Sequence, residues 1–218
     1  MQLNTIIFDM DGLLIDSEPL WGEAATEVFG NYGFQLSPAQ YAVTTGMRTK
    51  EFVEWWFKHY NIDMKHHAEA ENNILQTVVD KVAAKGKPMP GVEHIFNFFI
   101  ERNFKIGLAT SSGQKLIDVV IDKLGIRNFL QAIESAADLP YGKPHPQVYL
   151  NCAMALNSHP TECICFEDSF NGIIAAKAAR MRCVAVPGIH DKQNLKFNAA
   201  DLKISSLQNF NALLLQTL

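Results

Sequence analysis

The sequence predicts an α/β fold, with a Rossmann-like parallel sheet as its core and a small α-helical domain inserted after the first strand. Short apolar runs recur along the chain, and stretches with helical periodicity separate them. This alternation is typical of a parallel sheet with helices on both faces. A long helical stretch without a convincing strand indicates the insertion. We therefore expect a core of residues 1–16 and 89–218 and a helical domain of residues 17–88.

The first expected strand is the apolar run of residues 5–8, which is followed at once by Asp9 and Asp11. In an open α/β sheet, ligands bind at the carboxyl edge of the strands, where these acids would lie. Two neighbouring carboxylates repel each other unless a cation offsets their charge. Gly12 permits a sharp turn because glycine adopts positive φ freely. Ordinary strand-to-turn junctions also contain Asp and Gly, so this segment alone leaves both interpretations open.

The inserted domain is expected to begin with a helix at Ser17, which precedes Glu and Pro. Residues 37–40 form a capping-box pattern that starts a second helix. Residues 51–60 and 68–84 have helical character. The Gly- and Pro-rich segment 86–91 then breaks the pattern and predicts a linker back to the core.

The rest of the core alternates between helices and strands. The expected strands cover residues 106–109, 132–135, 163–166 and 183–186. The expected helices cover residues 92–100, 117–124, 146–156 and 170–180. Gly125 is expected to end the second of these helices.

Composition excludes several classes of protein. The chain has 218 residues, 48% of them hydrophobic and 19% charged, which is a soluble globular composition. A formal net charge of −4 argues against nucleic acid as a partner, because phosphate backbones need clustered Lys and Arg. No apolar stretch approaches the roughly 18 residues of a membrane span, and no leader pattern precedes Asp9. Four cysteines without a CxxC predict buried free thiols and a cytoplasmic location. Nothing in the sequence demands more than a monomer.

Polar side chains follow four of the expected strands. Besides the two acids after the first strand, they are Thr110-Ser111-Ser112, then Lys143 within Gly-Lys-Pro, and then Glu167-Asp168. Each group has an ordinary structural interpretation as a helix cap, a solvated loop lysine or an exposed turn. Parallel strands, however, deliver their carboxyl ends to one edge of the sheet. The coincidence of all four groups therefore predicts a single functional site.

These side chains suit phosphoryl transfer. A carboxylate can attack phosphorus and form an acyl phosphate, which divides one difficult displacement into two easier ones. Asp9, held most rigidly at the strand end, is the expected nucleophile. Asp11 would give a proton to the leaving alcohol and later take one from water.

The expected site must also offset the negative charge of a phosphate. Asp9, Asp168 and Glu167 offer the oxygen ligands that Mg²⁺ prefers. Lys143 adds a positive charge for the non-bridging oxygens. Thr110 and the backbone N–H groups after it would complete an anion site. Ser111 and Ser112 are candidate substrate-binding residues there.

The four groups in this order resemble the haloacid dehalogenase superfamily. DMDGLLIDSE, beginning at Asp9, is similar to its first motif, Thr110 to its second, Lys143 in GKPHP to its third and FEDS to its fourth. The resemblance implies the same nucleophile and acid/base, makes Thr110 and Lys143 phosphate binders, and makes Asp168 and the backbone carbonyl of Asp11 ligands of Mg²⁺. It also implies that residues 17–88 are the helical cap domain of this superfamily.

Within the superfamily, the chain is most similar to the branch of β-phosphoglucomutase and the bacterial 2-deoxyglucose-6-phosphate and hexitol phosphatases. This resemblance implies a hexose or hexitol phosphate as substrate. The mutase carries a histidine where this chain has Trp21, which favours hydrolysis over isomerisation. Trp21 is a candidate for stacking on a sugar or lining the closed cleft, with a place in the cap core as the alternative. Arg48, on an expected cap loop, is a candidate substrate contact.

Other functions remain as alternatives. A β-phosphoglucomutase-like phosphosugar mutase would use the same motifs. A non-enzymatic phospho-acceptor signalling domain also combines acids, a hydroxyl and Lys-Pro, but such domains are about half this length. A non-catalytic relative would be expected to have lost one of the motifs. A dehalogenase proper typically lacks the second acid of the first motif, so Asp11 argues against it.

Overall fold

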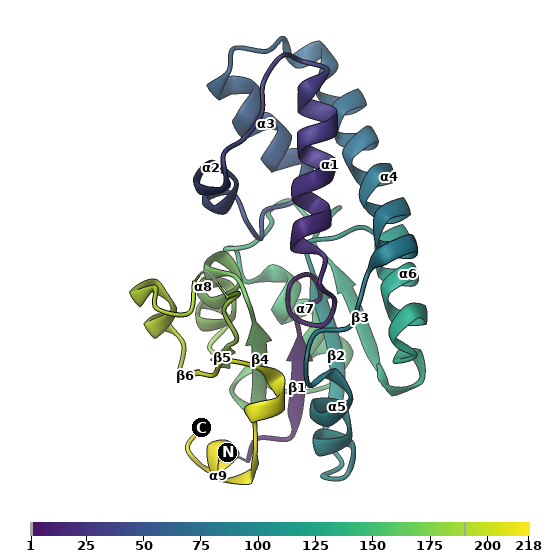
Figure 1. Cartoon of the computed structure of the whole chain (residues 1–218). Helices are drawn as coiled ribbons and strands as arrows, with labels where there is room; N and C mark the ends of the chain where they lie inside the picture. The colour runs from purple at the N-terminus through teal and green to yellow at the C-terminus, as the bar shows by residue number, and fades with distance from the viewer. Residues whose placement is uncertain (1, 190) are drawn as a thin grey trace.

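The core of the protein is a parallel sheet whose strands all point toward a helical layer at one end (Figure 1). The structure is a computed structural model that describes residues 2–189 and 191–218. Over these residues the sheet has six strands in the order β3-β2-β1-β4-β5-β6. The strands are β1 Thr5–Phe8, β2 Lys105–Thr110, β3 Ala132–Ser135, β4 Cys163–Glu167, β5 Arg182–Ala185 and β6 Leu202–Lys203. The predicted fold class is confirmed.

Helices α1 to α4 precede β2, and the remaining helices follow or separate the strands. The α-helices are α1 Glu18–Gly30, α2 Pro38–Val43, α3 Thr49–His59, α4 His67–Lys85, α5 Val92–Ile100, α6 Gln114–Leu124, α7 Gln147–Ala155, α8 Phe170–Ala178 and α9 Ala212–Gln216. Short 3₁₀ turns lie at Met64–His66, Arg127–Phe129, Pro160–Glu162, Leu195–Ala199 and Leu207–Asn209. The order of elements follows the predicted alternation.

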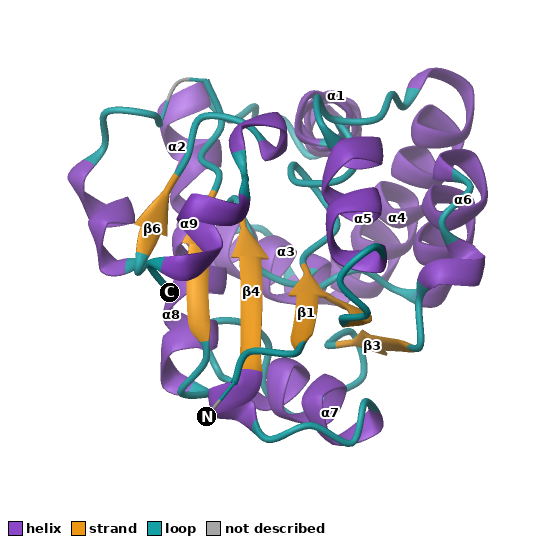
Figure 2. Cartoon of the chain, turned by 90° about the horizontal axis from the view of Figure 1, so that it is seen from below, coloured by secondary structure: helices purple, strands orange, loops and turns teal. Residues whose placement is uncertain are grey.

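The central strands are buried on both faces, as expected when helices cover a parallel sheet. Ile6 and Phe8 of β1 join the apolar cluster that includes α5 and α6, whereas Ile7 joins the cluster that includes α7 and α8. Figure 2 shows the strands side by side, with β6 at one edge and β3 at the other. Because successive side chains of a strand point to opposite faces, one apolar run supplies both clusters.

Helices α1 to α4 form a separate layer beyond the carboxyl ends of the strands (Figure 1). We call residues 17–88 the cap and the rest of the chain the core. Aromatic rings fill the interior of the cap, with Phe29 stacked on Phe34 at 4.6 Å between ring centroids and on Phe52 at 5.4 Å. The capping box predicted at residues 37–40 is present at the start of α2.

Two chain segments connect the cap to the core, and they lie side by side. Ile15 and Pro88 form an antiparallel bridge. The N–H of Asp16 donates to the carbonyl of Lys87 at 2.9 Å, and the N–H of Met89 donates to the carbonyl of Leu14 at 2.9 Å. The cap therefore leaves and re-enters the core at one place.

Several element boundaries differ from the sequence prediction, and one strand was not predicted. Strand β2 extends to Thr110, so this residue ends the strand instead of following it. Strand β4 extends to Glu167, so this acid ends the strand instead of following it. Strand β5 begins and ends one residue earlier than expected. The short edge strand β6 was not predicted, because two residues are too few to show a periodic pattern. All four cysteines are buried free thiols, as predicted.

Candidate active site

A small cavity of about 60 Å³ lies between the cap and the carboxyl ends of the strands. The core lines it with polar side chains at Asp9, Asp11, Thr110, Ser111, Ser112, Lys143, Asp168 and Ser169. The cap lines it mainly with Glu18, Trp21, Tyr41, Thr44, Met47 and Phe52. The structure therefore brings the groups from the four strand ends together at one site.

Lys143 lies at the centre of the charged part of the site. Its ammonium group donates to Asp9 Oδ1 at 2.5 Å, to Glu167 Oε1 at 2.7 Å and to the carbonyl of Ala109 at 3.1 Å. Only about 2% of Lys143 is exposed, and the Lys143–Pro144 peptide bond is cis. The lysine that resembles the third motif is thus a buried cation between Asp9, which follows β1, and Glu167, which ends β4.

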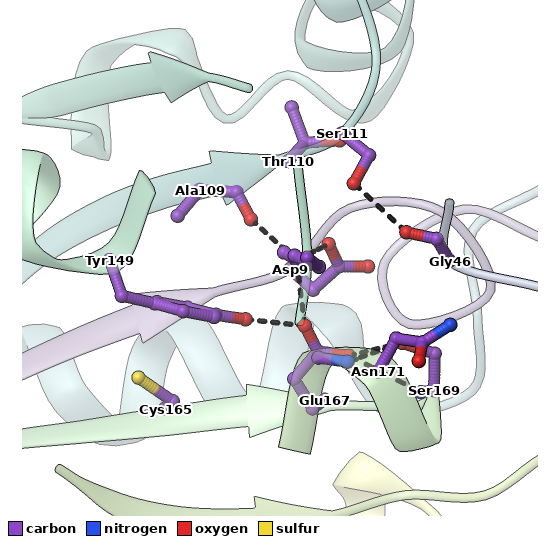
Figure 3. Close-up of polar contacts among 12 residues, drawn as sticks. Asp9, Gly46, Ala109, Thr110, Ser111, Tyr149, Cys165, Glu167, Ser169 and Asn171 are labelled. Carbon is purple, nitrogen blue, oxygen red and sulfur yellow. Dashed lines mark hydrogen bonds and ion pairs between the residues drawn. The ribbon is translucent and has the colours of Figure 1, made fainter. Parts of the chain in front are cut away.

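Glu167 is fully buried and has a full set of hydrogen-bond partners. Its Oε1 accepts from Lys143 and from the Tyr149 hydroxyl, and its Oε2 accepts from the N–H and the hydroxyl of Ser169 at 3.2 and 3.1 Å. Figure 3 shows Tyr149 and Ser169 on either side of this carboxylate. Glu167 therefore fixes Lys143 in place.

Three acids of the site lie close enough together to bind a divalent cation. Ligand oxygens of Asp9, Glu167 and Asp168 lie within 4.8 Å of one another. Burial raises the pKa of Asp9 well above its usual value, although Lys143 opposes this shift. Burial and the charge of Asp9 raise the pKa of Asp168 in the same way. Lys143 alone does not offset so many buried acids, and hard oxygen ligands are those that Mg²⁺ prefers. Asp9, Glu167 and Asp168 are therefore the side chains that could hold the ion.

Lys143 keeps its proton despite being buried. Burial alone would lower the pKa of its ammonium group, but the negative charges of Asp9 and Glu167 outweigh this effect and hold the pKa above its usual value. A permanent positive charge therefore lies directly beside Asp9.

Three hydroxyl or N–H groups donate to the carboxylate of Asp11. The Ser17 hydroxyl donates to Oδ1 at 2.7 Å, and the Trp21 indole N–H donates to the same oxygen at 3.0 Å. The Ser112 hydroxyl donates to Oδ2 at 2.7 Å. The Asp11 side chain does not belong to the cluster of Asp9, Glu167 and Asp168, so it is available for proton transfer.

The end of β2 and the loop after it carry the predicted hydroxyl residues. Thr110 is almost fully buried, and its Oγ1 accepts the N–H of Ser112 at 3.1 Å. The Ser111 hydroxyl donates to the carbonyl of Gly46 in the cap at 3.0 Å (Figure 3). Both serine hydroxyls therefore bond to the protein in this closed arrangement, although both residues line the cavity.

Arg48 lies elsewhere than expected. Its guanidinium group donates to the backbone carbonyls of Ala136 and Leu139 in the core, and it pairs with Glu51. Arg48 is about 4% exposed and is not among the residues that line the cavity. Arg48 is the N-cap residue of α3, and its side chain reaches the loop after β3. A direct contact with substrate would require these hydrogen bonds to break.

Two cap residues of the site were not singled out from the sequence. Glu18 and Tyr41 line the cavity opposite the core acids, and they share a side-chain hydrogen bond. Burial, together with the charge of Asp11, raises the pKa of Glu18 to about 7. Glu18 lies in the DSE segment of the first motif, which was a usable signal, whereas Tyr41 has no distinguishing pattern around it.

Two glycines permit close approach at the site. Gly12 has φ of +71°, and a Cβ there would lie 2.1 Å from Asp168 Oδ2. Gly46 has φ of +82°, and a Cβ there would lie 2.7 Å from the Ser169 hydroxyl. The turn predicted at Gly12 is confirmed, and Gly46 lets the cap loop approach the core.

Comparison with known proteins identifies the class to which this fold and site belong. The haloacid dehalogenase-like hydrolase family matches residues 6–186, which is most of the chain. The chain therefore belongs to this family, as its four motifs predicted.

Two curated relatives from Escherichia coli (strain K12) are phosphatases. Hexitol phosphatase B is 37% identical over 212 residues, covering 97% of this chain and 96% of that protein. Fructose-1-phosphate phosphatase YqaB is 31% identical over 184 residues, covering 83% of this chain and 95% of that protein. The prediction that the chain is a phosphatase of this family is confirmed.

Solved structures share the fold. The β-phosphoglucomutase from Clostridium difficile has a TM-score of 0.86 at 24% identity, covering 99% of this chain and 96% of that one. CbbY from Rhodobacter sphaeroides, solved with phosphate, has a TM-score of 0.88 at 23% identity and full coverage of both chains. At this identity the likeness concerns the arrangement of the chain only. In the described part of the chain, no helix has both the length and the apolar character for a membrane span.

Proposed function

We propose that this protein hydrolyses phosphomonoesters of small sugars or sugar alcohols with the help of Mg²⁺, through an aspartyl-phosphate on Asp9. The observation that carries the proposal is the position of Asp9. It directly follows β1, lines the cavity, and is paired with the buried ammonium group of Lys143. A nucleophile next to a fixed positive charge suits attack on a phosphate, which carries negative charge of its own.

The proposed reaction has two steps. An oxygen of Asp9 bonds to phosphorus while the bond to the sugar oxygen breaks, and Asp11 gives that oxygen its proton. Water then loses a proton to Asp11 and attacks phosphorus, and the bond to Asp9 breaks. Free phosphate and the original carboxylate result. Asp11 lines the same cavity as Asp9, as both proton transfers require.

The other residues bind and orient the phosphoryl group. Asp9, Asp168 and the carbonyl of Asp11 would hold Mg²⁺, which neutralises phosphate charge during transfer. Lys143 offers a fixed positive charge, and Thr110 orders the loop of Ser111 and Ser112 beside it. Glu167 holds Lys143 in place and offers a further oxygen to the metal, directly or through water.

The cap would exclude water and select the substrate. A cavity needs about 10–15 Å³ to hold one water, so about 60 Å³ accepts a phosphoryl group but not a whole hexitol phosphate. We propose that residues 17–88 act as a cap domain that opens at its two paired connections to admit substrate. The hexitol and fructose-1-phosphate phosphatase relatives support a hexose or hexitol phosphate. The monomeric state and the cytoplasmic location stay predictions.

Product analysis tests the reaction against the mutase and signalling alternatives. Phosphorus NMR should show that sorbitol 6-phosphate with Mg²⁺ yields inorganic phosphate. β-Glucose 1-phosphate should not yield glucose 6-phosphate at a comparable rate. Accumulation of an isomerised sugar phosphate with little free phosphate would support the mutase. A stable phosphoprotein without turnover would support a phospho-acceptor domain.

A further inference from the structure

Trp21 contacts the proposed acid/base residue directly. It lies one turn into α1, on the cap, and its indole N–H donates to Asp11 Oδ1 at 3.0 Å. Its ring also lines the cavity. An apolar ring would be enough to line the cavity. A lining role for Trp21 therefore does not explain why its indole N–H bonds to Asp11.

One of the three donors to Asp11 belongs to the core, and the other two belong to the cap at different distances from its connection to the core. Ser112 belongs to the core loop after β2 and stays with Asp11 whatever the cap does. Ser17 lies at the connection, next to the bridge between Ile15 and Pro88. Trp21 lies beyond the connection, so rotation of the cap about this point moves its N–H away from Asp11. The Trp21 bond is therefore the one that reports closure of the cap.

We propose that Trp21 is a positioning residue, whose indole N–H orients the Asp11 carboxylate for proton transfer when the cap is closed. The proposal rests on the proposed function, because it assigns the proton transfers to Asp11. A carboxylate can rotate about its side-chain bonds, and hydrogen bonds to both oxygens remove that freedom. Ser112 bonds to Oδ2 and Ser17 to Oδ1, and both hydroxyls can themselves rotate. Trp21 adds a second bond to Oδ1 from a rigid indole ring, so it narrows the remaining rotation of the carboxylate when the cap is closed. Proton transfer is then efficient only when the cavity is sealed from water.

The decisive comparison uses substrates with different leaving groups. The alkoxide of sorbitol 6-phosphate needs a proton from Asp11 in the first step, whereas p-nitrophenolate leaves unprotonated. Water needs Asp11 as base in the second step for both substrates. A badly oriented Asp11 should therefore slow both steps for the sugar alcohol but only the second step for the aryl ester.

The variant Trp21→Phe keeps an aromatic wall and removes the N–H. Its kcat with sorbitol 6-phosphate should fall about 10-fold, because acid–base catalysis contributes about 10²–10⁴-fold and two donors remain. KM should stay within about twofold, since the interaction lost acts on the reaction and not on binding. With p-nitrophenyl phosphate, a rapid burst of one p-nitrophenolate per site should precede slow turnover.

A matched control and an isosteric replacement separate this role from packing. Trp55→Phe removes an exposed cap tryptophan outside the cavity and should leave all rates unchanged. Replacing Trp21 with benzothienylalanine preserves the ring shape and removes only the N–H, so it should reproduce the burst even if Trp21→Phe folds poorly. An unchanged kcat with a raised KM, or no burst in the isosteric variant, would overturn the proposal. Wild-type protein without phosphatase activity would instead overturn the proposed function.

Discussion

The cap and the core contribute to the site through different kinds of contact. In the core, buried side chains bond to one another, as Lys143 does to Asp9 and Glu167. Between cap and core, single side chains mostly reach backbone carbonyls. Ser111 donates to Gly46, and Asn171 donates to Thr45 at 3.1 Å.

This difference separates chemistry from closure. Breaking a buried ion pair leaves an uncompensated charge and costs about 3–5 kcal/mol, so the core arrangement is fixed. A single hydrogen bond contributes a net of only about 0.5–1.5 kcal/mol, and water replaces it when the cap moves. The core is therefore suited to hold a reactive geometry, and the cap is suited to open and close over it.

The largest expected effect comes from the core nucleophile. Asp9→Asn should lower kcat by roughly 10³-fold or more, because an amide cannot form the acyl phosphate. The measurement is phosphate release at saturating substrate, with circular dichroism to verify folding. A folded variant that keeps more than about a tenth of the wild-type rate would remove Asp9 from the proposed role.

Removal of the metal should have the next largest effect. Metal ions supply several kcal/mol of charge stabilisation in such reactions, so chelation with EDTA should reduce turnover by about 10²-fold or more. Added Mg²⁺ should restore activity, and it should raise Tm because it binds the clustered acids of the folded state. Ca²⁺ should inhibit, since it accepts more ligands in looser geometry. Full activity after exhaustive chelation would contradict the proposed dependence.

Arg48 tests the contact between cap and core. Arg48→Met removes the bonds to the carbonyls of Ala136 and Leu139 while keeping an apolar stem. Because hydrogen bonds to charged groups contribute about 1.5–3 kcal/mol, kcat/KM should fall by about 10-fold or somewhat more as closure weakens. Lys58→Met, on the exposed side of the cap, serves as the control. A selective rise in KM for sugar phosphates, with unchanged affinity for inorganic phosphate, would instead indicate a direct substrate contact.

The smallest expected effect concerns Glu18 in metal-free protein. Its pKa is about 7 in the folded state against 4.5 as the model-peptide value, so the folded state binds more protons between these pH values. Stability should therefore fall as pH rises through this window, and Glu18→Gln should abolish that part of the decline. The difference in Tm between Glu18→Gln and wild type should therefore increase, in favour of the variant, by about 2–4 °C or more as the pH rises from 4.5 to 7.5. Glu27→Gln, on the exposed face of the same helix, should show no such gain.

The sequence predicted the core more completely than the cap. Asp9, Asp11, Thr110, Lys143 and Asp168 could be placed because parallel strands bring their ends to one edge. The cap contacts depend on how two separately packed layers meet, which no local pattern encodes. Thus Arg48 was expected at the substrate but bonds to the core, and Glu18 and Tyr41 were not singled out. The hydrogen bond from Trp21 to Asp11 was missed for the same reason.

The bridge between Ile15 and Pro88 has a consequence for how such proteins can diversify. Because the two ends of the cap meet, the cap is a module that could be exchanged for another of different length without displacing β1 or α5. Joining neighbouring ends costs little chain entropy, and each doubling of the inserted length adds only about 0.6 kcal/mol. Recombination at this point would alter which molecules reach the strand ends and leave the reacting groups untouched. Grafting a relative's cap between residues 16 and 88 is therefore a practical route to new selectivity.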